Sequence, residues 1–508
     1  MFGPALTLVL ALVSSAVIAV PMVDNVYKRA VDSLNPASTV LPFHFPESVY
    51  ENTPYSGAAS FVLLRKDDVK TATDYISNKL SLGADDFKVF DSYTDSAGIT
   101  HVYGAHMVNG ARIANHQASA HVKNGEVTSF SSSFGTSQHL AKRDLAVSAP
   151  KATVDFEKGP DGKVVYAYKF QLRNNPLTRW VQVWCDATTG KVIQAVDFAN
   201  KASYKGHPNP SSRCHSRIFN VNLFYISNVM HDISYQYGFT ERAGNFQTNN
   251  SGKGGQGNDA VVINVLNLSD IDNADFIAPP DGRPGVMNMY RFTSSTPNRN
   301  PGLDNTIVIH EYAHGISNRL TGGPSTGGCL STAEAGSMGE GWSDIIAMIV
   351  LAKSSDTATT RVTIGSYSKN RSTGLRSVPY TTDMKANPLT YGDLRTRSEV
   401  HDVGEVWASM LWDVYWNLVA KHGFSTNLYN ANQSAGNIVA MKIIMGGMML
   451  QPCNPTFLSA RNAIIAADAS YYDGANRCEI IRAFSKRGLG AEATRTRTND
   501  FSVPPECQ

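Results

Sequence analysis

The sequence contains no apolar run of the ~18–20 residues that a membrane-spanning helix requires, which excludes a multi-pass membrane protein. It also lacks a charge excess, since 45 Lys and Arg stand against 43 Asp and Glu. The net charge of +2 gives no electrostatic reason to expect nucleic acid or a membrane surface as a partner. Gly and Pro are not in excess and no repeat of 20–50 residues occurs, which excludes collagen-like and solenoid architectures.

The apolar content is sufficient for a large core. Of 508 residues, 42% are hydrophobic and 17% are charged, which excludes wholesale disorder. At roughly 150 residues per domain, this length predicts about three domains.

Two parts of the chain differ in their hydrophobic pattern. Residues 38–200 show short alternating strands and one helical stretch at about 69–82. After residue 203, Gly- and Asn-rich loops separate longer helical runs, which are predicted at 218–237, 304–320, 337–353, 399–421, 434–450 and 455–468. We therefore predict an α+β fold, with a mixed strand and helix region followed by a mainly helical one.

The N-terminus and the cysteines indicate an oxidising compartment. An apolar stretch runs from Ala5 to Val20, and Val17-Ile18-Ala19 within it has the pattern of a cleavage site. This pattern predicts a secretory signal peptide over residues 1–19. None of the six cysteines forms a Cys-x-x-Cys pair, so a thiolate zinc cluster is not expected. In a secreted chain disulfides are the usual outcome, and Cys453 and Cys478, which flank one helical stretch, are the predicted pair. Four sequons predict N-glycosylation, at Asn249, Asn267, Asn370 and Asn432.

One short segment carries metal chemistry. His310, Glu311 and His314 form His-Glu-x-x-His within an apolar, helix-period background. Residues four apart share a helical face, so both imidazoles can reach one zinc ion with Glu311 beside them. Zinc lowers the pKa of a bound water toward ~7, and a neighbouring carboxylate can pass the released proton to a leaving amine. The motif thus predicts a metal-dependent hydrolase with Glu311 as the general base.

The third metal ligand must come from elsewhere in the chain. Ser317 and Leu320 stand where the His-Glu-x-x-His-x-x-Gly-x-x-His form requires Gly and His, which excludes the metzincin class. A glutamate from a following helix is the other solution, and Glu334 and Glu340 compete. We prefer Glu340, because Asp344 lies one turn later and can accept the N–H of a ligating histidine. Glu334 has no such carboxylate and is expected to be structural.

Three segments together resemble the fungalysin family of secreted zinc metalloendopeptidases, relatives of the thermolysin type. They are HEYAHGISNRLTGG at 310–323, GEGWSDI at 339–345 and EVHDVGEVWASMLWD at 399–413. The resemblance implies zinc on His310, His314 and Glu340, with Glu311 as general base. It also implies an inhibitory and folding-assisting propeptide over residues 20–202. Residues 203–508 would then form a two-lobed, thermolysin-like catalytic domain with a mainly helical C-terminal lobe.

The same resemblance suggests two further sites. Asn273 and Ala274 resemble the edge strand that binds extended substrate, and an added strand would align the substrate carbonyl at the metal. His401 resembles the histidine that donates a hydrogen bond to the tetrahedral oxyanion. A tyrosine usually assists there, and Tyr380 and Tyr391 both remain candidates.

The predicted function is a secreted, extracellular zymogen that becomes an endopeptidase. Its partners would be polypeptide substrates, from extracellular or host proteins, and its own propeptide. Ca²⁺ is a possible second cofactor, to which the sequence assigns no residue. The alternative is a catalytically impaired zinc-binding homologue that acts as a binding module. The intact Glu311 argues against this alternative. In its favour, the segment at 206–214 is several dozen residues shorter than in the family, which would shorten the N-terminal lobe.

Overall fold

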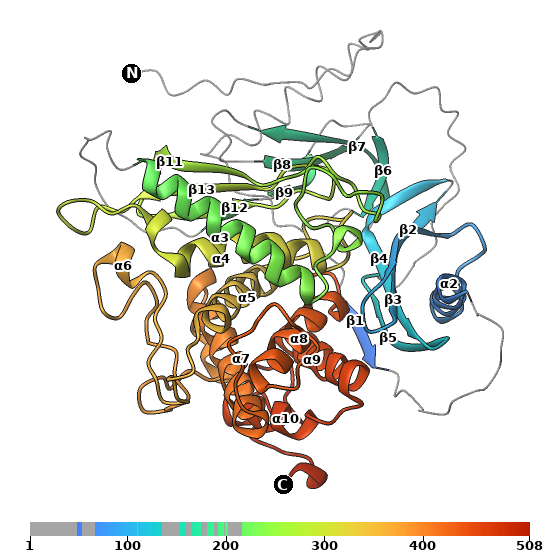
Figure 1. The fold of residues 1–508 in the computed structure, drawn as a ribbon. Coiled ribbons are helices and arrows are strands. Elements are labelled where there is room, and N and C mark those ends of the chain that lie inside the picture. The colour runs from blue at the N-terminus through green and yellow to red at the C-terminus, as the bar shows by residue number, and fades with distance from the viewer. Residues whose placement is uncertain are drawn as a thin grey trace.

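The structure is a computed structural model and describes residues 48–52, 67–108, 110–134, 153–158, 164–173, 180–186, 192–197, 199–201 and 216–508. The predicted signal peptide and the join at 206–214 lie outside these residues. A strand-rich N-terminal region precedes a helix-rich C-terminal one, as Figure 1 shows, which confirms the predicted α+β fold. None of the described helices is both long and apolar enough to cross a membrane.

The N-terminal region forms a largely antiparallel sheet of nine strands. The order β1-β5-β4-β6-β7-β8-β9 runs across it, β3 pairs with β4, and β2 pairs with β3. Helix α2 (Asp68–Leu80) matches the predicted stretch at 69–82 and buries Ala72 and Ile76 against this sheet. The strands are β1 (Val49–Asn52), β2 (Phe87–Thr94), β3 (Ile99–Val108), β4 (Ala111–Lys123), β5 (Glu126–Ser132), β6 (Thr153–Lys158), β7 (Val164–Arg173), β8 (Trp180–Asp186) and β9 (Val192–Asp197).

A second sheet has four strands in the order β10-β12-β13-β11. They are β10 (Ala199–Lys201), β11 (Val262–Ile271), β12 (Ala274–Ile277) and β13 (Val286–Arg291). Strand β12 runs antiparallel to both β10 and β13, whereas β11 and β13 are parallel. Helices α3 (Ser216–Gln236) and α4 (Asn305–Leu320) lie below this sheet in Figure 1, with α3 against β11 and α4 against β12.

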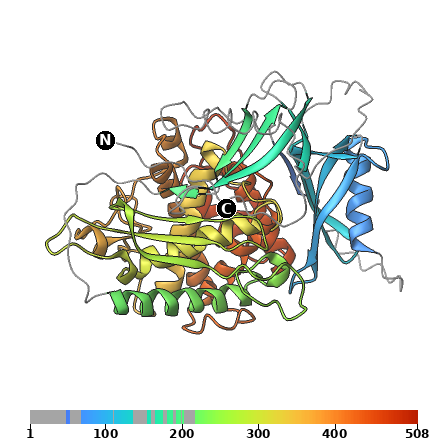
Figure 2. The same ribbon diagram turned by 90° about the horizontal axis from the view of Figure 1, so that it is seen from above.

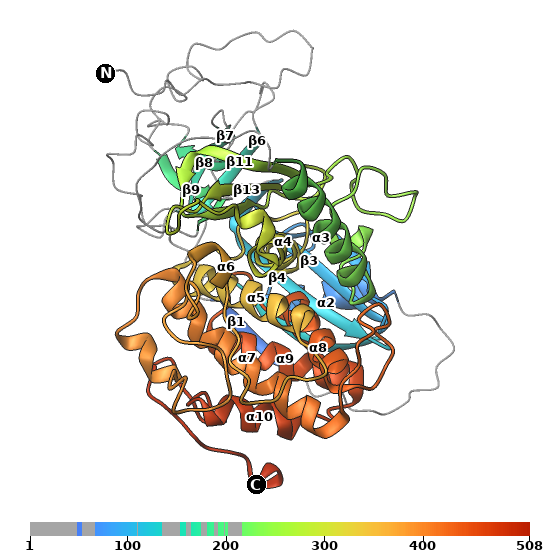
Figure 3. The same cartoon turned by 60° about the vertical axis from the view of Figure 1, so that its left-hand side comes forward.

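The remaining helices form the C-terminal part, which Figure 3 shows below the second sheet. They are α5 (Ala333–Leu351), α6 (Ser366–Lys369), α7 (Val400–His422), α8 (Gly436–Leu450), α9 (Phe457–Tyr472) and α10 (Arg477–Lys486). The core centres on α5 and α7, where the buried rings of Trp342 and Trp407 pack edge to face at 5.1 Å. Helix α5 contacts both α4 and α7, so it connects the sheet-bearing part to the helical part.

Two glycines let α5 and α7 touch backbone to backbone. A Cβ atom on Gly404 would lie 2.7 Å from the Glu340 Cβ and 2.8 Å from the Ser337 carbonyl oxygen. A Cβ on Gly341 would lie 2.6 Å from the Gly404 carbonyl oxygen. No other residue type fits these positions without moving the helices apart. This close approach brings His401 on α7 next to Glu340 on α5.

The cysteine pairing differs from the prediction. Cys453 bonds to Cys329 and Cys478 bonds to Cys507, with Cα–Cα distances of 4.5 and 5.0 Å, so the predicted Cys453–Cys478 pair is wrong. The 16 residues of α9 separate those two positions by about 24 Å of helix, far beyond the span of a disulfide. Cys453 instead follows α8 and meets the loop between α4 and α5.

The first sheet packs on the helical part. The hydroxyl of Tyr103 donates to the Met449 carbonyl oxygen at 2.9 Å, and the Tyr471 hydroxyl donates to Asp95 at 3.1 Å. Ser325 donates to Asp91 at 3.2 Å, and burial at this contact raises the pKa of Asp91 to about 6. Figure 2 shows strands β2–β5 and α2 beside the C-terminal helices. The N-terminal region therefore contacts α8, α9 and the loop after α4, in addition to the pairing of β10 with β12.

The predicted glycosylation sites differ in accessibility. Asn249, Asn370 and Asn432 are exposed. Asn267 is buried, and its side-chain amide donates to Asn288 inside the fold at 3.1 Å, which leaves that nitrogen no room for a glycan. N-glycosylation at Asn267 is therefore not compatible with this fold.

Candidate metal centre and active site

Helix α4 presents His310, Glu311 and His314 at one buried place. All three side chains are buried, and the Nε2 atoms of the two histidines lie 3.0 Å apart. Glu340 reaches them from α5, with Oε2 at 3.1 Å from Nε2 of His310 and Oε1 at 3.6 Å from Nε2 of His314. Within the described part of the chain, these three residues are the only His, Cys, Asp or Glu group able to hold a metal ion.

The donor atoms fit a tetrahedral ion. Zinc–ligand bonds of ~2.0–2.2 Å imply ligand–ligand separations of roughly 3.3–3.5 Å along the edges of a tetrahedron. The two Nε2 atoms lie 3.0 Å apart, and they lie 3.1 and 3.6 Å from the Oε2 and Oε1 atoms of Glu340 respectively, which is close to that range. Two histidine nitrogens and one carboxylate, with a corner left for a water or substrate, are the donor set of catalytic zinc sites. The residues present therefore suit a divalent metal, and zinc in particular.

Asp344 orients the His310 ring. Its Oδ1 atom accepts the Nδ1 hydrogen of His310 at 2.7 Å, which directs Nε2 toward Glu340. The Arg376 guanidinium donates to the same carboxylate from Nε at 2.6 Å and from Nη2 at 2.8 Å, and the Tyr380 hydroxyl also donates to it. Burial disfavours the charged carboxylate, but Arg376 and His310 outweigh it and hold the pKa of Asp344 well below its usual range. A permanently ionised Asp344 keeps His310 in one tautomer.

Glu334 lies elsewhere in the fold. Its carboxylate accepts the backbone N–H of Phe457 at 2.9 Å and a bond from Arg497 at 2.8 Å. Phe457 is the first residue of α9, so Glu334 satisfies one of the N–H groups that a helix start leaves unpaired. The structure therefore brings Glu340, and not Glu334, to the two histidines.

Glu311 is poised as a proton acceptor. Its Oε2 atom is buried and has no hydrogen-bond partner among the described residues. Burial raises the pKa of the Glu311 carboxyl well above its ordinary value, and His310 opposes this rise. A carboxylate with a free oxygen and weakened solvation is suited to take a proton from water.

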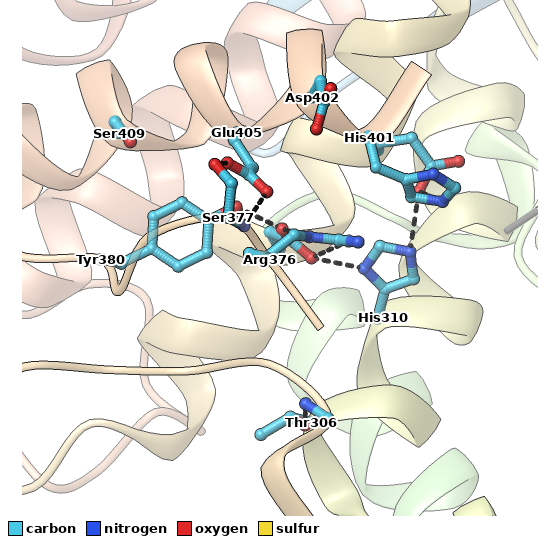
Figure 4. Close-up of polar contacts among 12 residues, drawn as sticks. Thr306, His310, Arg376, Ser377, Tyr380, His401, Asp402, Glu405 and Ser409 are labelled. Atoms are coloured by element: carbon cyan, nitrogen blue, oxygen red, sulfur yellow. Dashed lines mark hydrogen bonds and ion pairs between the residues drawn. The ribbon is translucent and has the colours of Figure 1, made fainter. Parts of the chain in front are cut away.

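His401 reaches the same place from the start of α7. Its Nε2 atom lies 3.3 Å from Oε2 of Glu340, and its Nδ1 atom lies 2.7 Å from Oε1 of Glu399. Glu399 is also the N-cap of α7 and accepts the backbone N–H groups of His401 and Asp402. Figure 4 shows the rings of His401 and His310 side by side. One carboxylate thus fixes both the helix start and the imidazole.

Asn273 and Ala274 lie at the start of β12. Both are buried, and Asn273 turns its amide toward Asp270 at 3.2 Å. The outer side of β12 is covered by β10, which pairs Ala199 with Ile277 and Lys201 with Asp275. With β10 in place, Asp275–Ile277 of β12 lie inside the sheet, and the role of Asn273 and Ala274 in binding extended substrate stays a prediction.

Some residues of the site carried no clear signal in the sequence. Glu399 could have been found, since an acidic residue at the start of a predicted helix is a capping candidate. Arg376 and Tyr380 lie in a segment without regular secondary structure, and no periodicity places that segment against Asp344. Of the two tyrosines considered, Tyr380 bonds to Asp344, and Tyr391 donates to the Thr494 carbonyl oxygen at 3.0 Å.

Comparisons with known proteins agree with this arrangement. The family model described as Fungalysin metallopeptidase (M36) matches residues 152–493, and the Fungalysin/Thermolysin Propeptide Motif matches residues 85–134. Extracellular metalloproteinase 2 of Trichophyton tonsurans is 50% identical over 293 residues, which cover 56% of this chain and 46% of that protein. Extracellular metalloproteinase mep of Aspergillus fumigatus is 48% identical over 302 residues, or 58% and 47% of the two chains.

The chain spans about half the length of the curated relatives it matches. Among solved structures, the Bacillus megaterium YpeB C-terminal domain covers 34% of this chain and 96% of its own at 11% identity. Its TM-score of 0.17 is too low to indicate a shared fold. The family match, in contrast, extends over most of the chain and includes every residue of the candidate metal centre. The chain belongs to the fungalysin metallopeptidase family.

Proposed function

We propose that this chain is the zymogen of a secreted, zinc-dependent endopeptidase. The observation that carries the proposal is the convergence of His310, His314 and Glu340 on one buried point, with a free oxygen of Glu311 beside it. The names of the relatives, which describe extracellular metalloproteinases, support both secretion and proteolysis.

Each side chain at the site has a chemical role in this proposal. Bound zinc would supply a Lewis acid that polarises the scissile carbonyl and acidifies water. Glu311 accepts the proton of the attacking water and delivers it to the leaving amine. His401, held at Nδ1 by Glu399, donates from Nε2 to the developing oxyanion, which requires N–H groups on both ring nitrogens. Asp344 keeps the His310 lone pair directed at the metal position.

Chelator-sensitive cleavage tests the proposed function. The matured protein should cleave casein and an internally quenched peptide, lose that cleavage when 1,10-phenanthroline removes the metal, and regain it on addition of Zn²⁺. Cleavage that continues unchanged after the metal has been removed would contradict a metal-dependent mechanism. Stoichiometric zinc without any cleavage would instead favour the binding-module alternative.

We also propose that residues 20–202 are the propeptide and residues 203–508 the catalytic domain. The propeptide-motif match at 85–134 supports this division. In this proposal β10 inhibits by substrate mimicry, because it adds an antiparallel strand to β12 at Asp275–Ile277, directly after the Asn273 and Ala274 positions proposed to bind extended substrate. The substrates would then be extracellular polypeptides that replace β10 after maturation.

Weakening β10 should accelerate maturation. Replacing residues 199–201 by Gly-Gly-Gly raises the free-energy cost of ordering β10 by about 0.5–1 kcal/mol per residue. Over three residues this increases the population of zymogen molecules with β12 uncovered by roughly 10–100-fold. The rate at which the full-length band disappears on gels should rise accordingly. The same substitution at residues 195–197 in β9, which pairs with β8, is the matched control. Equal rates in the two variants would contradict a specific role of β10.

A further inference from the structure

We propose that Glu405 is a positioning residue of the metal centre, a role that rests on the proposed function. In this proposal Glu405 fixes the segment Arg376–Tyr380, and this segment fixes Asp344 and through it the His310 ring. The chain of contacts starts on α7, the helix that also carries His401, and ends at a metal ligand on α4.

Glu405 holds Ser377 at two points. Its Oε1 atom accepts the backbone N–H of Ser377 at 2.5 Å, and its Oε2 atom accepts the Ser377 hydroxyl. Arg397 reinforces this contact, with Nη1 at 3.4 Å from Oε2 of Glu405 and Nη2 at 3.2 Å from Oγ of Ser377. Figure 4 shows the Glu405 carboxylate directed at Ser377, next to the Arg376 guanidinium.

Backbone hydrogen bonds fix the two ends of the held segment, and the Leu375 N–H, just before it, donates to the Ile364 carbonyl oxygen at 2.8 Å. Arg376 and Ser377 belong to no helix or strand. Two backbone hydrogen bonds join Tyr380 to Val362, at 2.8 and 2.9 Å, and anchor the other end of the segment. From this segment, Arg376 and Tyr380 place three donors on the Asp344 carboxylate. A bidentate guanidinium contact requires a fixed backbone. Leu375 is fixed on one side of Arg376 by Ile364, and Glu405 fixes Ser377 on the other side.

Burying the Glu405 carboxylate costs desolvation free energy, which its hydrogen bonds must offset. Glu405 is 2% exposed, and burial raises the pKa of its carboxyl although the bonds from Ser377 oppose the rise. An apolar side chain would avoid the desolvation cost at this position. Glu405 follows His401 by four residues and thus lies on the same face of α7. One helix face therefore sets the position of the proposed oxyanion donor and of the segment behind His310.

Metal affinity measures this role directly, without relying on turnover. In the Glu311→Gln background, which prevents self-cleavage, we compare Glu405→Met, of similar size but without an acceptor, with Glu405→Gln, whose amide oxygen still accepts the Ser377 N–H. Glu479→Met is the matched control, since it removes a partly buried carboxylate that pairs with Lys421 at the opposite end of α7. The readouts are the Zn²⁺ dissociation constant, from chelator competition, and the visible d–d spectrum of the Co²⁺-substituted protein.

Glu405→Met should weaken zinc binding by about 10-fold and alter the Co²⁺ spectrum. Outer-shell partners such as Asp344 typically contribute roughly 10–100-fold, and Glu405 acts through Asp344, so the lower end of that range is expected. Glu405→Gln should stay within about threefold of the parent, and Glu479→Met should match the parent in both readouts. A Glu405→Met protein that binds zinc as tightly as Glu479→Met overturns the proposal and leaves the proposed function intact. A parent protein that binds no zinc overturns both.

A second variant covers the case in which Glu405→Met does not fold. Ser377→Ala removes one hydroxyl donor and keeps the backbone bond to Glu405. It should weaken zinc binding by about threefold, the effect of part of one hydrogen bond. An unchanged zinc affinity and Co²⁺ spectrum in Ser377→Ala would then overturn the proposal.

Discussion

Replacing Glu311 with Gln should abolish most peptide-bond hydrolysis while the protein keeps its zinc. Glutamine matches glutamate in size but cannot accept the proton of the attacking water, and general acid–base catalysis contributes roughly 10²–10⁴-fold. The proposed ligands His310, His314 and Glu340 are unchanged, so the metal site should persist. Kinetics on a quenched peptide, with zinc content measured on the same sample, give both quantities.

Glu492→Gln is the matched control for this experiment, because Glu492 is exposed and lies outside the site. It should retain full activity. If Glu311→Gln cleaved peptide as fast as this control, another group would have to accept the proton. Loss of zinc together with activity in Glu311→Gln would show instead that Glu311 supports the metal site.

The second large effect concerns the two competing glutamates. Glu340→Ala should weaken zinc binding by more than about 100-fold, since loss of a ligand exceeds the effect of losing an outer-shell partner. Glu334→Ala should keep the zinc and lose about 1–2 kcal/mol of unfolding free energy, because the N–H of Phe457 at the start of α9 loses its acceptor. Metal analysis and urea denaturation on both variants separate these outcomes. Exchanged phenotypes would assign the ligand role to Glu334.

The local part of the site is predictable from sequence. Residues four apart on a helix share a face, so His310 and His314 indicate a common ligand. The same spacing joins Glu340 to Asp344, and from it the sequence predicts that Glu340, and not Glu334, lies beside the two histidines, as the structure has it. In the structure Asp344 does bond to His310. These relations hold within one or two helical turns, where helix geometry alone determines the distances.

Contacts between distant segments are not predictable in this way. Arg376 meets Asp344 from an irregular segment 32 residues later in the chain, and the pairing of β10 with β12 joins residues about 75 positions apart. The disulfide between Cys329 and Cys453 spans 124 residues. Such contacts depend on how separate elements pack, as α5 and α7 do at Gly341 and Gly404. Neither periodicity nor residue spacing encodes that packing.

The proposed extension of the site beyond the metal ligands follows from the same packing. Glu399 caps α7 just before His401 and Glu405 lies one turn after it, and each fixes a different neighbour. Glu399 orients the His401 ring, whereas Glu405 holds the segment that contacts Asp344. If both roles are correct, α7 is the element that aligns the metal centre with the oxyanion donor.

X-ray absorption at the zinc edge, combined with a crystal structure of the matured protein, tests the central claim most directly. The account predicts one zinc per chain, bound by Nε2 of His310, Nε2 of His314 and the Glu340 carboxylate at ~2.0–2.2 Å, with the fourth position held by a non-protein ligand. A Glu340 side chain turned away from the metal, or a fourth ligand supplied by the protein, would contradict it.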